Sequence, residues 1–306
     1  MKRPSPYSCL NSLPPLIKAI SYFDTVRVWL PHHLNKEQKA SLKKLCGSLN
    51  YHGRKGREFD ICRFKLNGRM HRYAVAVLLN QPSSEAIAFL AELFPRDIPP
   101  IINSVHIALD FLTCTTLDAE RIQTLINRSL YRGYLNRKEP PKSVKGTWYS
   151  HPRGAPSVLT SYSDRPCRHT GSPCCHVEIR LHRVKRVRDI GIDSLDDLLA
   201  FDHLAYWSKH LDLRRIEVEK LGKRLKGRHF NAKPKLYQVG SRLRNADAWH
   251  ANHVLRLIAY RHGLFLSEAP LMVLQHGLRA KFECDLKGVL TKIDNSVFLH
   301  GLQVWE

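Results

Sequence analysis

The chain has 306 residues, which is long enough for two domains of ordinary size or for one large domain. Apolar residues make up 43% of it, enough to fill a core, and this argues against wholesale disorder. Lys and Arg number 49 against 27 Asp and Glu, and the resulting formal net charge of +22 favours a polyanionic partner. Nucleic acid is the first candidate for that partner, and a ribosome-associated or membrane-surface protein is the alternative.

The N-terminus begins with basic residues, but prolines follow, and no apolar run is long enough for a signal peptide or a membrane span. We therefore expect a cytoplasmic protein without a membrane partner, in which cysteines stay reduced. Cys167, Cys174, Cys175 and His176 are close enough in sequence to raise the question of zinc. A second Cys-x-x-Cys pair is lacking, and adjacent Cys174 and Cys175 would point to opposite faces of a strand, so the pattern does not favour structural zinc.

Strands and helices alternate along the first two thirds of the chain. Alternating or β-rich runs predict strands at 24–30, 58–66, 70–79, 104–113, 145–150, 157–163 and 175–183. Capping residues and apolar stripes predict helices at about 35–47, 83–95 and 117–130. Asn67-Gly68 joins the second and third strands as a hairpin, and two Pro-, Gly- and Arg-rich stretches, 135–146 and 163–174, are expected to be loops.

This order predicts an α+β fold in which an antiparallel sheet has helices on one face and leaves the other free for a ligand. Beyond residue 190 the pattern becomes mainly helical, at 193–199, 203–225, 246–265 and 268–293. We expect one domain at 1–195 and a helical, basic region at 196–306. Between residues 214 and 244, eleven Lys or Arg residues accompany two acidic ones. The DNA-binding candidates in this stretch are Lys223, Arg224, Lys226, Arg228, Lys233 and Lys235.

Two of the predicted strands are apolar on one face and carry ionisable groups on the other. His106 shares a face with Asp110 on the first strand, and His176, Glu178 and Arg180 share a face on the second. Imidazole and carboxylate ligands with open coordination positions suit Mg²⁺ or Mn²⁺ better than structural zinc. The alternative interpretation of His106 is a packing histidine, and Arg180 would be a phosphate clamp, an ion partner of Glu178, or both.

Tyr162 ends the strand that precedes Arg165 and Arg168, two residues close enough in sequence to steady a phosphate. A tyrosine with a pKa near ~10 is a poor nucleophile until a metal polarises the phosphate or a neighbour lowers that pKa. A strand-end aromatic that packs on a loop is the other interpretation.

Three segments carry a resemblance to a known family: Val105-His106-Ile107-Ala108, Thr160-Ser161-Tyr162-Ser163, and Val177-Glu178-Ile179-Arg180-Leu181, which runs into Ile190-Gly191-Ile192. Their order and spacing resemble the replication initiators of filamentous bacteriophages, the gene II/gene X family, and more distantly the rolling-circle plasmid initiators. The resemblance covers roughly residues 55–210, including the 58–79 hairpin. The chain departs from the family where His106 replaces an acidic residue and Asp164-Arg165 replaces a lysine. Ala108 also leaves a His-hydrophobic-His metal motif incomplete.

The resemblance implies an RRM-like sheet of the rolling-circle initiator type and a metal-dependent, site-specific DNA endonuclease and strand transferase. His106 and Glu178, assisted by Asp110 or His176, would hold Mg²⁺ or Mn²⁺. Tyr162, helped by Arg165 and Arg180, would attack the scissile phosphate and leave a 5′-phosphotyrosine and a free 3′-hydroxyl without using ATP. The implied partners are single-stranded origin DNA and a host helicase.

Other classes of protein remain open at this stage. A mobilisation relaxase or single-tyrosine transposase shares such a sheet, and a prophage remnant would retain binding alone. A non-catalytic nucleic-acid-binding protein on an RRM-like sheet would be expected to expose aromatic residues for base stacking.

Overall fold

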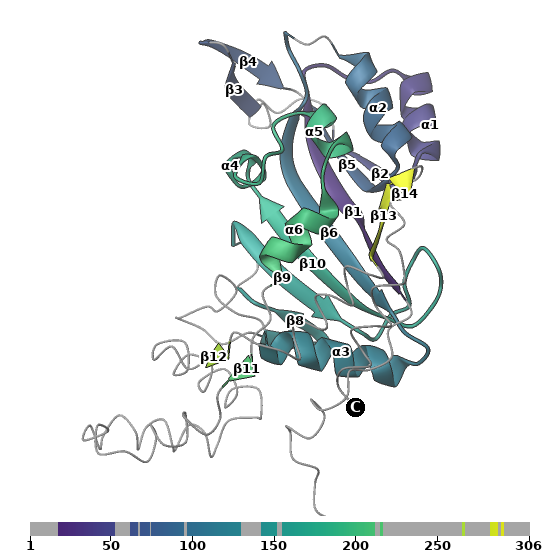
Figure 1. The fold of residues 1–306 in the computed structure, drawn as a ribbon. Coiled ribbons are helices and arrows are strands. Elements are labelled where there is room, and N and C mark those ends of the chain that lie inside the picture. Colours follow the sequence, from purple (N-terminus) through teal and green to yellow (C-terminus); the bar gives the residue numbers. More distant parts are fainter. Residues whose placement is uncertain are drawn as a thin grey trace, which may run out of the picture.

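The computed structural model describes residues 18–52, 62–66, 68–73, 75–94, 97–129, 142–151 and 155–211, together with four short strands between 215 and 290. The main sheet of this described part has ten strands (Figure 1). They are β1 (Lys18–Leu30), β2 (Cys46–His52), β5 (Val75–Pro82), β6 (Ile101–Leu112), β7 (Lys142–Val144), β8 (Thr147–Tyr149), β9 (Ser157–Tyr162), β10 (Cys174–His182), β13 (Phe282–Leu286) and β14 (Val289–Leu290).

The long path through the sheet runs β14-β13-β1-β6-β10-β9-β8-β7, and β5 also pairs with β1 and carries β2 at its other edge. Every pairing is antiparallel except that of β13 with β1. Two small sheets stand apart: the hairpin of β3 (Cys62–Leu66) and β4 (Arg69–Tyr73), and the pair β11 (Arg215–Ile216) and β12 (Phe265–Leu266). The prediction of an α+β fold with a mainly antiparallel sheet is confirmed.

Six helices are described, and each of them contributes buried apolar side chains to one core on the same face of the sheet. They are α1 (Lys36–Lys44), α2 (Ser84–Leu93), α3 (Thr116–Ser129), α4 (Val184–Arg188), α5 (Leu195–Leu199) and α6 (His203–His210). The strand residues predicted to lie under helices, Val105, Ile107, Val177 and Ile179, are at most 1% exposed. None of the described helices is long and apolar enough to cross a membrane.

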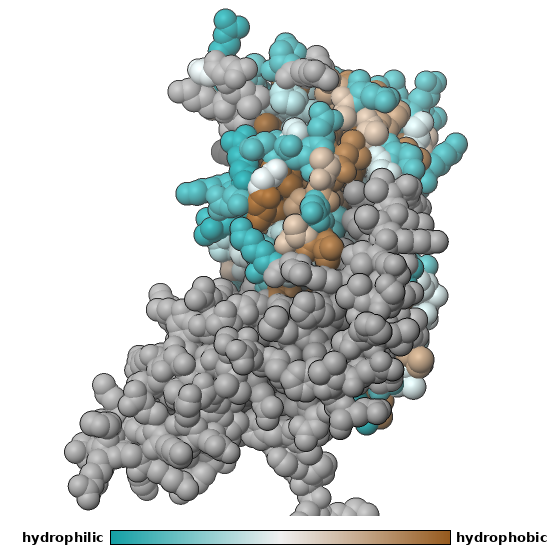
Figure 2. All heavy atoms as spheres, in the orientation of Figure 1, coloured by the Kyte–Doolittle hydropathy of each residue, from teal (hydrophilic) through white to brown (hydrophobic). Residues whose placement is uncertain are grey.

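The helix starts follow the local sequence. Asn35 and Gln38 form the expected reciprocal capping box at α1, in which the Asn35 side chain accepts from the Gln38 amide at 2.8 Å. Ser83 caps α2 in the same way, by accepting a hydrogen bond from the Ala86 amide. On the helix face, apolar side chains gather over α5 and α6 (Figure 2), where a hollow of about 360 Å³ opens between Ile190, Phe201 and Tyr206.

The structure corrects the predicted elements in several places. The predicted strand 70–79 is two strands, because β4 pairs with β3 in a separate hairpin and β5 pairs with β1 and β2 in the main sheet. Tyr73, at the end of β4, is buried and donates a hydrogen bond to the Pro99 carbonyl. Part of the predicted loop 135–146 is strand β7, which a two-residue turn at Lys145-Gly146 joins to β8. Both turn residues have positive φ, as hairpins of this length require.

The C-terminal third also differs from its helical prediction where it is described. Residues 282–286, within the predicted helix 268–293, form β13, and their alternation of apolar and acidic residues in Phe-Glu-Cys-Asp-Leu has the period of a strand. β11 interrupts the predicted helix 203–225 after α6 has ended at His210. The helices predicted at 193–199 and at the start of 203–225 are present as α5 and α6, whereas 265–266 and 289–290 are the strands β12 and β14. The other residues predicted to be helical beyond 211 lie outside the described residues, and the boundary between 195 and 196 stays a prediction.

Candidate metal site on the open sheet face

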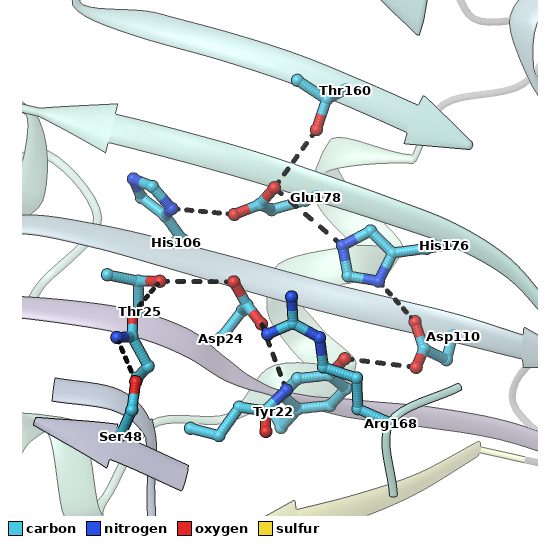
Figure 3. Close-up of polar contacts among 12 residues, drawn as sticks. Tyr22, Asp24, Thr25, Ser48, His106, Asp110, Thr160, Arg168, His176 and Glu178 are labelled. Carbon is cyan, nitrogen blue, oxygen red and sulfur yellow. Dashed lines mark hydrogen bonds and ion pairs between the residues drawn. The ribbon is translucent and has the colours of Figure 1, made fainter. Parts of the chain in front are cut away.

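The face of the sheet opposite the helices collects polar groups from four neighbouring strands, β1, β6, β10 and β9 (Figure 3). The register sets Asp110 of β6 opposite His176 of β10, and Glu178 opposite Thr160 of β9. Because side chains alternate along a strand, these groups project to the same side, as the sequence predicts for His106, Asp110, His176, Glu178 and Arg180.

A bulge in β1 adds Asp24, which the sequence analysis did not single out. Phe23 pairs with Ile107, but the next pairing is Thr25 with His106, so Asp24 is an extra residue in β1. The bulge reverses the alternation, since Phe23 and Val26, three residues apart, both enter the helix-side core. Bulges commonly re-aim a side chain beside a functional site. A pair of apolar residues at this odd spacing is the sequence signal that would have found Asp24.

Asp24, His106 and Glu178 bring their ligand atoms together within 4.8 Å of one another, and they are the one such group among the described residues. His106 Nδ1 lies 2.8 Å from Glu178 Oε1. The Asp24 and His106 side chains are about one-fifth exposed, whereas the Glu178 side chain is only 2% exposed. The group therefore has a buried carboxylate at its base and two residues that solvent can reach.

Glu178 is held by contacts that differ between its two oxygens. Oε2 accepts hydrogen bonds from Thr160 Oγ1 at 3.2 Å and from Arg180 Nε at 2.9 Å. Oε1 is buried and has no hydrogen-bond partner, although His106 lies in ion-pair contact with it. Burial raises the pKa of Glu178, but the contacts with His106, His176 and Arg180 outweigh burial and hold that pKa well below its usual range.

These features fit a divalent cation. Two carboxylates and one imidazole are ligands that Mg²⁺ or Mn²⁺ accepts, and a cation bound between them would take the place of the present contact between His106 and Glu178 Oε1. Asp24 and His106 reach the group from the solvent side, which leaves positions for water or phosphate oxygen.

Asp110 and His176 lie beside this group as a separate buried pair. His176 Nδ1 is 2.6 Å from Asp110 Oδ1, and Tyr22 Oη donates to Asp110 Oδ2 at 3.2 Å. Burial lowers the pKa of His176, but hydrogen bonds to Asp110 and Glu178 outweigh it and raise that pKa to about 10. The two carboxylates favour the cationic form of the imidazole, with Asp110 Oδ1 at 2.6 Å from Nδ1 and Glu178 Oε2 at 3.9 Å from Nε2.

Tyr162 stacks on His176. The two ring centroids are 4.4 Å apart and the ring planes are inclined by 21°. Burial, and then the charges of Asp110 and Glu178, raise the pKa of the Tyr162 hydroxyl above its ordinary value. Arg165 lies over the same ring, with its guanidinium carbon 5.1 Å from the centroid, and is more than half exposed.

The loop 163–173 brings a second arginine to the site. Arg168 Nη1 is 3.9 Å from Asp24 Oδ1, and the arginine side chain is 62% exposed. Arg180, by contrast, is turned to Glu178 through Nε and Nη2, at 2.9 and 2.8 Å, so its ion-pair role is the one present here. Exposed arginines beside a carboxylate-rich site can contact phosphate oxygens without losing an existing buried partner.

The remaining predicted residues divide into two groups. Cys167 and Cys174 are buried in a small apolar cluster with Tyr22 and Ala108. They are not part of the metal-type group, the name used from here on for Asp24, His106 and Glu178. The six DNA-binding candidates, Lys223, Arg224, Lys226, Arg228, Lys233 and Lys235, lie outside the described residues.

Comparison with known proteins leaves the family open. No family model and no curated protein matches the chain. Among solved structures, a rolling circle replication initiator protein from Geobacillus stearothermophilus is similar over 60% of this chain and 79% of that one, at 10% identity and a TM-score of 0.32. A similarity this low does not decide function, which is argued below from the residues of the site.

Proposed function

We propose that this protein is a metal-dependent DNA strand-nicking and -joining enzyme that initiates rolling-circle replication, with Tyr162 as its nucleophile. The observation that carries the proposal is the group Asp24, His106 and Glu178, whose ligand atoms converge on the same open sheet face as a tyrosine. Tyr162 is opposite His176 in the register, one diagonal away from Glu178. A metal-type group and a hydroxyl nucleophile at this spacing suit phosphoryl transfer.

Asp24, His106 and Glu178 would hold Mg²⁺ or Mn²⁺, which when bound would neutralise charge that develops on the scissile phosphate. Arg180 and Thr160 keep the Glu178 carboxylate in place through its other oxygen. Arg165 and Arg168 are free enough to bind phosphates on either side of the scissile bond. Asp110 fixes His176, and His176 in turn supports the Tyr162 ring.

The chemistry exchanges one phosphate ester for another. The Tyr162 oxygen bonds to phosphorus while the bond to the 3′ oxygen breaks, and the phenol proton is balanced by the proton that the leaving 3′-hydroxyl acquires. Because the pKa of Tyr162 is raised, the hydroxyl is protonated in the free protein and loses its proton only during attack. The product ester conserves the energy of the phosphodiester, so the reverse reaction rejoins a strand without ATP.

The net charge of +22 supports the binding of DNA. The DNA must be locally single-stranded at the nick. The order of the three segments resembles the filamentous phage gene II/gene X type, and neighbouring genes would distinguish that type from a mobilisation relaxase or a single-tyrosine transposase. Origin DNA and a host helicase are the partners that this assignment implies. The basic residues between 223 and 235 would add phosphate contacts.

The test is incubation of the protein with an end-labelled single strand that carries the origin, with Mn²⁺ or with EDTA. We expect a covalent adduct on a denaturing gel with Mn²⁺ and none with EDTA. If the protein binds the strand but forms no adduct with any divalent metal, the proposal of a nicking enzyme is overturned. The protein would then be a non-catalytic nucleic-acid-binding protein.

A further inference from the structure

The β3–β4 hairpin is a basic arm that the nicking chemistry does not use. It forms a two-stranded sheet of its own, and Figure 1 shows it projecting from the end of the main sheet. From residue 62 to residue 73 the chain has four Lys or Arg residues, one His, and no Asp or Glu. The described side chains near its turn are outward: Arg69 and Arg72 are exposed, and Met70 is 59% exposed.

The arm is attached to the main body of the protein at one end, and its sequence has an excess of positive charge. Tyr73 is fully buried and donates a 2.8 Å hydrogen bond to the Pro99 carbonyl, which attaches the end of β4 next to the start of β6. In the register, Arg63 is directly opposite Arg72. The arm therefore has an excess of positive charge in its sequence, which a bound polyanion would neutralise.

We propose that the β3–β4 arm binds double-stranded DNA beside the cleavage site by lying in a groove of the duplex. A two-stranded ribbon has the width that the major groove of B-DNA admits. Arg69 and Arg72 would contact phosphates, and the exposed Met70 would make an apolar contact with base edges. Single-strand binding would instead call for exposed aromatic rings, and in β4, where the side chains are described, the Tyr73 ring is buried.

The position of the arm relates it to the metal-type group. β6 begins at Ile101, next to Pro99, and His106 lies five residues further along. At roughly 3.3 Å per residue, the base of the arm is about 17 Å from His106, a distance that about five base pairs would span. The assignment of duplex DNA rests on the shape and charge of the arm, whereas its placement next to a nick rests on the proposed function.

The experiment compares Arg69→Ala/Arg72→Ala with Lys43→Ala/Lys44→Ala, which removes the same charge from the exposed last turn of α1. Fluorescence anisotropy would measure affinity for a short duplex and for a single strand of the same length, over a range of salt, in EDTA so that no cleavage occurs. We expect the arm variant to lose duplex affinity, with the salt slope reduced by about two, and to keep its single-strand affinity.

Three outcomes would overturn the arm's role: an equal loss in the α1 variant, an equal loss for the single strand, or unchanged duplex binding. Both variants change only exposed side chains, so matching thermal midpoints should show that the fold is intact. Since binding is measured without metal, the result is independent of whether an adduct forms. Failure of the nicking proposal would leave the arm's duplex binding standing, and the reverse also holds.

Discussion

The ring of Tyr162 lies almost flat on the imidazole of His176, with centroids 4.4 Å apart and planes inclined by 21°. Asp110 holds that imidazole at its edge, through Nδ1 at 2.6 Å, so the tyrosine stacks on a buried ring that is fixed by a hydrogen bond. The stack limits the positions that the phenol can take without fixing its hydroxyl to any acceptor. Restricted orientation of a nucleophile is one of the larger contributions an enzyme makes to rate.

Tyr162→Phe should abolish the covalent adduct and leave the fold and DNA binding intact. Phenylalanine keeps the ring that stacks on His176 but has no oxygen that can form a phosphate ester. Tyr149→Phe, on the neighbouring strand β8, is the matched control and should still form the adduct. An adduct in the Tyr162 variant, measured on a denaturing gel with Mn²⁺, would make Tyr149 the next candidate nucleophile.

His176→Asn should slow adduct formation by roughly 10- to 100-fold, because it removes the ring on which Tyr162 rests. An amide in its place can still donate to Asp110, which limits the cost of leaving that carboxylate buried without a partner. If His176 supports the tyrosine but does not bind metal, the variant should keep the stabilisation that Mn²⁺ gives the wild type. Loss of the Mn²⁺ effect in a thermal unfolding experiment would instead identify His176 as a ligand.

The sequence predicts the open face well where the strands are regular. His106 and Glu178 were expected on one face because period-two alternation is unbroken through β6 and β10. They lie on these adjacent strands as diagonal neighbours in the register, with His106 Nδ1 2.8 Å from Glu178 Oε1. Asp24 was missed because the β1 bulge shifts that alternation by one residue. Asp110 and His176 were expected near the metal from their face alone, and the face does not reveal that they pair with each other.

Tertiary contacts decide the other differences. β4 pairs with β3 and β5 pairs with β1 and β2, and no local pattern in residues 70–79 signals this change of partner after Tyr73. The strand character of 282–286 is visible in its alternation, but five residues are too few to compete with helical spacing in a long window. Sequence patterns therefore predict the elements and their faces here, while bulges and anchoring contacts set the detailed site.

Unfolding of the protein should become easier as the pH falls, partly because of His203. This histidine is 1% exposed, and burial lowers its pKa to about 3. Its Nδ1 meets Ser21 Oγ at 2.8 Å, and Trp207 donates to the same hydroxyl. Between about pH 6.5 and pH 3 the unfolded chain takes up a proton that the folded chain does not, so this one group should reduce stability by about 1.4 kcal/mol per pH unit.

The pH effect can be isolated with His203→Asn, since an amide N–H can donate to Ser21 Oγ in place of Nδ1, while the Ser21 hydroxyl itself donates to the Ala108 carbonyl. Denaturant unfolding at several pH values below 6.5 should give a shallower dependence on pH for the variant than for the wild type. His33→Asn, at an exposed position, is the control and should keep the wild-type dependence. Equal slopes in all three proteins would mean that His203 is not the buried neutral group described here.

Asp24→Asn should remove the response of the protein to Mn²⁺. A metal that binds only the folded state stabilises it by about 2.7 kcal/mol at a hundredfold excess over the Kd, so the wild-type unfolding midpoint should rise with Mn²⁺. Asp24 is one of three residues with converging ligand atoms, and an amide binds a divalent cation less well than a carboxylate.

Asp189→Asn makes the same chemical change at an exposed carboxylate that pairs with Arg186, and it should keep the full Mn²⁺ shift. Because the Asp24 side chain is partly exposed, the variant should fold with a midpoint close to that of the wild type in EDTA. If both variants respond to Mn²⁺ as the wild type does, Asp24 is not a ligand; if the wild type itself shows no shift, the metal site is wrong.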